Sequence, residues 1–247
     1  MIAALLIAAG AAIGLYGARS LLKPAPAAPG LSSPPDAPPA ALPPSLPSLD
    51  ESDGFVRGRA GALSSDPAFH EWLKQESLIP RLTAAMSRIA QGGVPRDIFF
   101  IFAPRGKFVV VKKNGKAFID PAGYARYDRF AAMVQSSDAA AAARLFEELL
   151  PLFDAAQRGL GEKNASAREA FFAAVRELLQ APVLADPVAL KDGKKGIGWI
   201  YADERLENLS LAQKQLMRMG PKNQAAVQAK LGAVAQALGM PAARTSP

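Results

Sequence analysis

The side chains best suited to bind a charged ligand are concentrated in the middle of the chain. Between Arg96 and Arg129, eight Lys or Arg side chains oppose three Asp side chains, and aromatic residues lie among them. Clustered cations attract anionic polymers, and tyrosine rings can pack against them. The pattern alone favours a simpler interpretation, in which these lysines lie on a solvated strand face and protect a sheet edge from aggregation. The candidate binding residues are Arg105, Lys107, Lys112, Lys113, Lys116, Tyr124 and Tyr127.

Catalytic chemistry has little support in the sequence. The absence of Cys excludes disulfides, thiolate metal sites and Cys nucleophiles. The single histidine, His70, has no second His in motif spacing, so we expect a structural role for it. A nucleophile elbow, a metal triad and a phosphate-binding loop are all missing. We therefore expect no catalytic residue, no metal site and no cofactor, and a hydrolase is kept only as a minor alternative.

A β-hairpin is expected to position the candidate lysines. Residues 108–112 and 117–119 are rich in β-branched and aromatic side chains, and Asn114-Gly115 between them is typical of a tight hairpin turn. Residues 98–102 predict a third strand. Pro121 then ends the sheet and begins a helix that carries the two candidate tyrosines.

The remainder of the body reads as mostly helical. Helix starts are predicted at Pro67, after the capping boxes that begin at Ser166 and Ser210, and at Pro221, while Pro151 is expected to kink or break a helix. A second hairpin is predicted from residues 188–190 and 197–201, which flank a Gly- and Lys-rich turn. The predicted fold class is α+β, mostly α: a single helical domain with one or two β-hairpins, behind an N-terminal transmembrane helix and a Pro-rich linker.

Composition divides the chain into four parts. Residues 2–22 are apolar enough for a transmembrane or signal-anchor segment, because a snorkelling Arg19 extends the uncharged run. A cleaved signal peptide is the alternative, although no basic residue precedes the apolar run. Residues 23–48 form a disordered, Pro-rich linker that can reach about 75 Å as a polyproline helix. The globular domain is expected at 49–239, and a disordered tail at 240–247.

The orientation in the membrane is open on sequence grounds. Arg19 and Lys23 follow the apolar segment and would hold the body in the cytoplasm, but two cations are a weak signal. We expect a single-pass protein of the cell inner membrane whose soluble domain faces the periplasm rather than the cytoplasm.

Several short segments together are similar to a known family. They are residues 49–53 with Phe55-Val56, Gly93-Val94-Pro95-Arg96, Ala103-Pro104 with Gly106 and Phe108, Ile119-Asp120-Pro121 with Tyr124, Arg126-Tyr127-Asp128, Leu209-Ser210, residues 213–216, Arg218-Met219-Gly220-Pro221 and Asn223. With these the chain resembles a bacterial family of membrane-anchored proteins catalogued as domain of unknown function 3014. Leu211 departs from the pattern, since members of the family tend to have Pro there. The resemblance implies a body behind a hydrophobic segment and a Pro-rich linker, and it implies no activity.

Three classes of function follow from these observations. The first is a tethered envelope binding or scaffold module that contacts an anionic polymer or a protein partner through the candidate residues. The second is a cytoplasm-facing module for nucleic acid or anionic lipid, which would use the basic C-terminal helices and bind in a salt-sensitive way. Nucleic acid is the less favoured partner, because an ordinary packed helix pair explains residues 210–239 better than a helix-turn-helix DNA-binding motif does. The third is the hydrolase, and the oligomeric state is open.

Overall fold

The computed structural model describes residues 42–43, 45–106, 108–161, 166–184, 187–193 and 198–241. The predicted membrane segment at 2–22, most of the linker, Lys107 and the last six residues of the tail lie outside this part. Within the described residues, no helix is long and apolar enough to cross a membrane.

The fold is α+β and mostly α, as the sequence predicted. The described α-helices are α2 (Ser52–Ala60), α3 (Pro67–Leu73), α4 (Leu78–Ala90), α5 (Asp128–Ser136), α6 (Ala139–Gly159), α7 (Ala167–Leu179), α8 (Glu204–Glu207), α9 (Leu211–Met217) and α10 (Pro221–Ala237). The 3-10 helices are η1 (Leu49–Glu51), η2 (Gly61–Leu63), η3 (Phe100–Phe102) and η4 (Pro121–Tyr127). The strands are β1 (Val110–Lys113), β2 (Lys116–Ile119), β3 (Ala189–Asp192) and β4 (Trp199–Tyr201).

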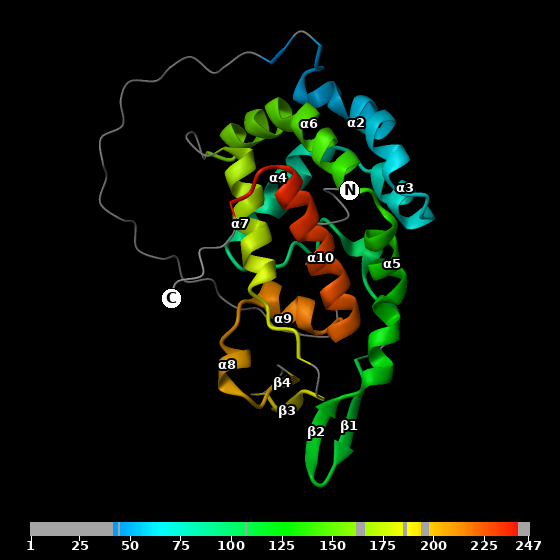
Figure 1. The fold of residues 1–247 in the computed structure, drawn as a ribbon, viewed down its shortest axis with the longest axis vertical. Coiled ribbons are helices and arrows are strands. Elements are labelled where there is room, and N and C mark those ends of the chain that lie inside the picture. Colours follow the sequence, from blue (N-terminus) through cyan, green and yellow to red (C-terminus); the bar gives the residue numbers. More distant parts are fainter. Residues whose placement is uncertain are drawn as a thin grey trace, which may run out of the picture.

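The helices form the body, with α4 and α7 packed against each other and α10 lying across α5, α6 and α7 (Figure 1). Their apolar faces bury one core that is rich in aromatic rings, including Phe146, which contacts both Phe153 and Phe171. Trp72 is fully buried, and its indole N–H donates to the carbonyl oxygen of Ile98 at 3.1 Å. This bond satisfies the only polar atom of a large apolar side chain, as a buried Trp requires.

The N-terminal part of the body is joined to the central helix α4 by side chains of α2. The carboxylate of Asp53 accepts from the backbone N–H groups of Ser77 (2.7 Å) and Leu78 (2.8 Å), which begin α4. The guanidinium of Arg57 donates to the carbonyl oxygens of Leu73 and Gln75. Two groups that a helix start leaves unsatisfied are thus capped from a distant part of the sequence.

The body begins earlier than composition suggested. Leu42 and Leu46, which composition assigned to the Pro-rich linker, pack against the core. Ser52, just after η1, is fully buried, and its hydroxyl donates to the carbonyl oxygen of Leu49 at 2.8 Å.

The two predicted hairpins are confirmed, and they join into one antiparallel sheet with the strand order β1-β2-β3-β4. Asn114 and Gly115 both have positive φ at the first turn, as a tight hairpin turn requires. Ala117 pairs with Leu190 across the junction of the hairpins. Because β2 and β3 are antiparallel, the turn at residues 114–115 and the β3–β4 connection lie at the same end of the sheet. This end points away from the helices, opposite the start of the body (Figure 1).

Two local predictions, the strand at 98–102 and the capping box at Ser166, were wrong, and in both cases contacts distant in sequence decide the structure. Residues 98–102 form no strand; instead they make a turn and η3, with Ile98, Phe99 and Phe102 buried in the core. Pro151 lies inside α6 and does not break the helix. Ser166 makes no capping bond; the carboxylate of Asp154 accepts from Ala167 N instead, at 2.8 Å.

Candidate anion-binding surface

Three lysines lie side by side across the sheet. Lys113 pairs directly with Lys116 across the first hairpin. Ala117 pairs with Leu190, so Lys116 and Lys191 are the next residues along their strands and face the same side. Neighbouring strands are about 4.7–4.9 Å apart, which places the three ammonium groups within reach of one ligand. We call Lys113, Lys116 and Lys191 the lysine row.

The face that carries the lysine row holds no acidic side chain among the described strand residues. Alternation puts Val111, Phe118 and Ile200 on this outer face, all partly buried. The inner face is the core side, where Ala117, Ile119, Leu190 and Tyr201 are buried. Asp192, the one acidic residue of the described strands, lies with the inner set. The outer face therefore combines cations with apolar side chains and has no internal counter-ion.

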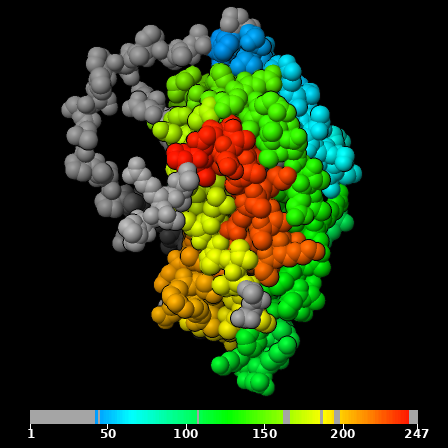
Figure 2. Space-filling view, in the orientation of Figure 1, coloured from blue at the N-terminus to red at the C-terminus, as the bar shows by residue number. Residues whose placement is uncertain are grey.

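The end of the sheet is also hollowed. A shallow depression of about 450 Å³ is bordered by Lys112, Lys116, Lys191, Asp192 and Trp199, among others, so one carboxylate lies in it beside the lysines. The sheet forms the lower end of the molecule in the space-filling view, where the first hairpin stands free of the body (Figure 2). All three side chains of the lysine row are exposed. Lys191 was missed in the sequence because only the pairing of β3 with β2 brings it beside the first hairpin.

The seven predicted binding residues do not form one site. Lys112, Lys113 and Lys116 are exposed on the first hairpin. Arg105 is also exposed, but it lies in a different hollow beside α3 and α5. Lys107 lies outside the described residues.

The two tyrosines are structural in this fold. The ring of Tyr124 is packed so closely on Gly220 that a Cβ there would lie 2.4 Å from Tyr124 Cγ. Tyr127 is 1% exposed, so it cannot reach a ligand at the surface. Its hydroxyl is buried beside Arg126 in a geometry that falls short of a hydrogen bond. Burial raises the pKa of Tyr127, and the nearby charges of Arg126 and Arg218 oppose that shift.

The basic C-terminal helices use their polar side chains internally. The amide of Gln224 donates to the carbonyl oxygens of Ala181 and Pro182. Lys214 pairs with Glu207 at 2.8 Å, and Lys230 donates to the carbonyl oxygen of Ser137 at 2.6 Å. Side chains committed in this way are poorly placed to read a nucleic acid. The pair α9–α10 is packed as an ordinary helical hairpin, which begins with the predicted capping box of Ser210 and Gln213.

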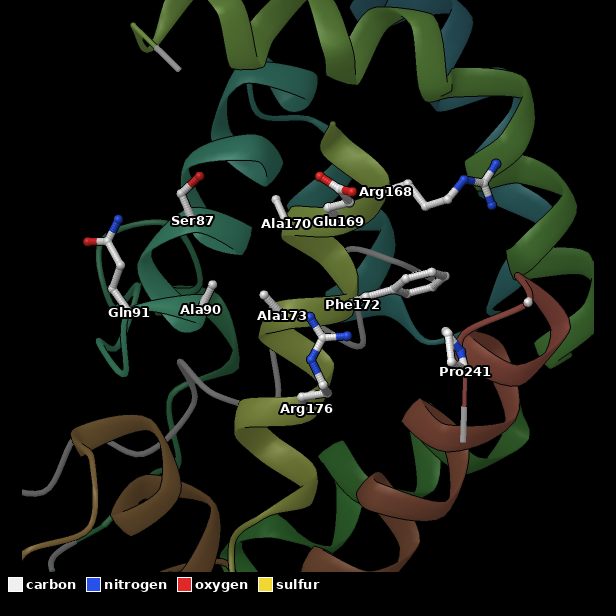
Figure 3. A pocket seen from close by; sticks show the side chains of 11 residues that line it. Ser87, Ala90, Gln91, Arg168, Glu169, Ala170, Phe172, Ala173, Arg176 and Pro241 are labelled. Atoms are coloured by element: carbon white, nitrogen blue, oxygen red, sulfur yellow. The ribbon is translucent and has the colours of Figure 1, made fainter. Parts of the chain in front are cut away.

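A larger hollow, of about 800 Å³, opens between α4, α7 and the end of α10 (Figure 3). Small side chains form its floor, and the side chain of Arg168 turns away from it toward α6, where it pairs with Glu147. Glu169 and Arg176, one acidic and one basic, remain at the rim. This near balance of charge gives the hollow no preference for an anion.

Residues suited to acid–base chemistry are scattered. His70 is exposed and contacts the ring of Phe69. In the described part of the chain, no group of three or more His, Cys, Asp or Glu side chains is arranged to hold a metal ion. Asp120 caps η4, and Asp128 accepts a hydrogen bond from Asn223. These carboxylates have structural partners and do not converge on a pocket with His70.

Comparison with known proteins places the chain in a family. A family model described as a protein of unknown function (DUF3014) matches residues 78–235. The chain belongs to this family. No curated protein and no solved structure matches it. The matched residues contain the whole sheet and most of the helical body, so the lysine row lies within the family domain.

Proposed function

We propose that this protein is a membrane-tethered binding module of the bacterial envelope, and that the lysine row binds an anionic polymer or an acidic protein surface. The observation that carries the proposal is the arrangement of Lys113, Lys116 and Lys191 on one face, on which the described strand residues place no acidic side chain. Like charges opposite each other on a sheet cost roughly 0.2–1 kcal/mol each. A bound polyanion would offset this repulsion, because each ammonium group would then lie beside a negative charge.

The chemistry of the face suits an extended ligand better than a single ion. Phe118 lies two residues from Lys116 on the same side and remains partly exposed. A flat face with cations and a ring can contact several units of a polymer in succession. The same side chains would also fit an acidic, partly apolar protein surface.

The position of the sheet suits a tethered module. The described chain enters the body at one end, and the sheet forms the other (Figure 1). A linker that approaches from the N-terminal side would leave the lysine row pointing away from the membrane. We propose a single-pass anchor at residues 2–22 and a periplasmic body, which together give the row access to envelope polymers.

A binding titration tests the site. The full-length protein in nonionic detergent would be titrated with labelled polyglutamate, and anisotropy would be recorded at low and moderate salt. We expect the triple variant Lys113→Gln, Lys116→Gln, Lys191→Gln to bind about tenfold more weakly or worse, since each lost contact is worth roughly 0.2–1 kcal/mol. The difference should shrink as salt rises.

A charge-matched control separates the surface from the net charge. Lys74, Arg144 and Lys222 are exposed and lie off the sheet. Their triple Gln variant removes the same charge and should bind as the parent does. Equal losses in the two variants would mean that only net charge matters, and the proposed surface would be wrong. Duplex DNA and anionic vesicles, titrated in parallel, test the cytoplasmic alternative.

Topology is tested separately. Alkaline phosphatase and a fluorescent protein that folds only in the cytoplasm would each be fused after Pro247. Activity of the phosphatase fusion alone supports a periplasmic body. Fluorescence alone would place the body in the cytoplasm and make anionic lipid or nucleic acid the leading partner.

A further inference from the structure

A pocket of about 580 Å³ lies on the body, away from the lysine row. It opens between the start of α3, the chain that follows η3, and the first turns of α5. Its apolar wall includes Phe102 and Phe130, whose rings meet edge to face at 6.1 Å between centroids. Its charged side chains are Asp66, Glu71, Arg105, Arg126 and Arg129.

The carboxylates of this pocket already have partners. The guanidinium of Arg129 donates to both oxygens of Asp66, at 3.0 and 3.2 Å. Glu71 pairs with Lys74 at 2.7 Å. In the described part of the chain, no carboxylate lies within ion-pair distance of Arg105 or Arg126. Arg105 and Arg126 are therefore two cations of the pocket lining that have no carboxylate partner among the described residues.

Arg126 is held in place by aromatic rings rather than by acids. Its guanidinium carbon lies 5.6 Å from the centroid of Phe108 and 5.1 Å from that of Tyr127. The Nε and Nη1 atoms are buried without a hydrogen-bond partner. Arginine is weakly hydrated and can be stacked in this way, but buried donors without acceptors are costly. A bound anion in the pocket that Arg126 lines would compensate the buried positive charge, although it would not reach these two buried atoms.

We infer that this pocket binds a small organic anion, in which one carboxylate or phosphate group is joined to an apolar part. Arg105 and Arg126 would hold the acidic group, and the wall around Phe102 and Phe130 would hold the apolar part. The volume lies in the range of about 300–1,000 Å³ that is usual for small-molecule sites. None of the three lysine-row residues lines the pocket, so this inference stands apart from the proposed function.

Soluble aromatic probes test the inference without forming micelles. The full-length protein in nonionic detergent would be titrated with 2-naphthoate and 2-naphthyl phosphate, and calorimetry would give affinity and stoichiometry. We expect saturable binding of one molecule per chain by at least one of the two anions. Neutral 2-naphthol has the ring without the acidic group, and inorganic phosphate has the acidic group without the ring. Both should bind at least tenfold more weakly.

Matched variants locate the site. Arg105 is exposed, so Arg105→Gln should fold normally and weaken binding about fivefold or more. Arg126→Gln should weaken it more, and Ala103→Phe, which narrows the pocket without changing charge, should also reduce affinity. Arg144→Gln, an exposed charge outside the pocket lining, is the control.

Several outcomes would overturn the inference. One is the absence of binding by either anion up to about 10 mM, a concentration beyond the range of useful affinity. Another is equal binding of 2-naphthol, which would indicate apolar adsorption, or equal binding of inorganic phosphate, which would indicate a plain anion site. Unchanged affinity in both Arg105→Gln and Ala103→Phe would show that the anion binds outside this pocket. These results are independent of the polyglutamate titration.

Discussion

The polar side chains of two regions differ in their surroundings. They are buried and hydrogen-bonded at the junction between η4 and the α9–α10 turn, and they are exposed in the lysine row. At the junction, the buried amide of Asn223 donates to the carbonyl oxygens of Tyr124 and Met219 and to the carboxylate of Asp128. Gly220 fits against the ring of Tyr124 with no space for a Cβ. On the sheet, the three lysines face solvent and one another, and the strand residues that the structure describes place no acid on that face.

This difference separates the residues that maintain the fold from those available to a ligand. The junction brings together several of the segments on which the family resemblance rests. Because the residues of these segments contact one another there, we assign them a structural role. The lysine row adds nothing to the core and opposes sheet formation through charge repulsion. Substitutions in the two regions should therefore change stability in opposite directions.

The largest effect is expected at Gly220. Its φ is +79° and a Cβ would lie 2.4 Å from a ring atom of Tyr124, so Gly220→Ala combines backbone strain with a clash. We expect a loss of about 3 kcal/mol or more in the free energy of unfolding. Gly232→Ala is the control on the same helix, because nothing lies within 4 Å of its Cβ position. Urea unfolding of both variants measures the difference, and equal stability would contradict the proposed packing.

Asn223 provides the next largest effect. Asn223→Ala removes a donor that joins three acceptors and should lower stability by about 1–3 kcal/mol. Asn223→Asp should cost more, because it replaces the donor with an acceptor beside Asp128. The same urea titrations test this ranking. If Asp is tolerated better than Ala, the hydrogen bonds are assigned incorrectly.

Through Tyr127, the stability of the fold should depend on pH. Burial raises the pKa of folded Tyr127 above the usual value of about 10 for a tyrosine, so the folded state keeps a proton that the unfolded chain loses. The stability that this group contributes is present below about pH 10 and falls as pH rises through the folded pKa. In Tyr127→Phe the loss of stability between about pH 9 and 11 should be shallower. Tyr124, whose pKa is also raised, first by burial and then by Asp120, remains in both proteins as a shared background.

The smallest effect, with the opposite sign, is expected for the lysine row. The triple Gln variant should raise the free energy of unfolding by about 0.5–1 kcal/mol, because it removes like charges from adjacent strands. The same variant should lose polyanion binding. Lower stability in this variant would mean that the lysines support the sheet, and the contrast between the two regions would fail.

Local sequence signals predicted local structure well. The Asn114-Gly115 turn, the capping box at Ser210 and the helix start at Pro67 depend on residues within four positions of each other. The α+β, mostly α fold class follows from such signals. They could not show that the two hairpins form one sheet, because the pairing of Ala117 with Leu190 spans a long stretch of sequence.

The candidate site was predicted only in part for the same reason. The lysines of the first hairpin were recognised from their own neighbourhood, whereas Lys191 reaches them only through strand pairing. Tyr127 was misassigned because a tyrosine near cations looks the same in sequence whether it is exposed or buried. Arg126 was counted among the cations, but its place between two rings follows from the packing of residues 108 and 127.

The contacts of Asp53 and Arg57 also determine how a pull on the N-terminal side would be transmitted. A force directed along the chain at residue 48 would meet η1 and α2 first, and from there the bonds of Asp53 to Ser77 and Leu78 pass it to the centre of the body. Those bonds would be loaded in shear together with the contacts of Arg57 to Leu73 and Gln75. The sheet lies at the other end of the long axis, beyond this line of load (Figure 1). A tethered molecule under tension would therefore keep its lysine face undistorted.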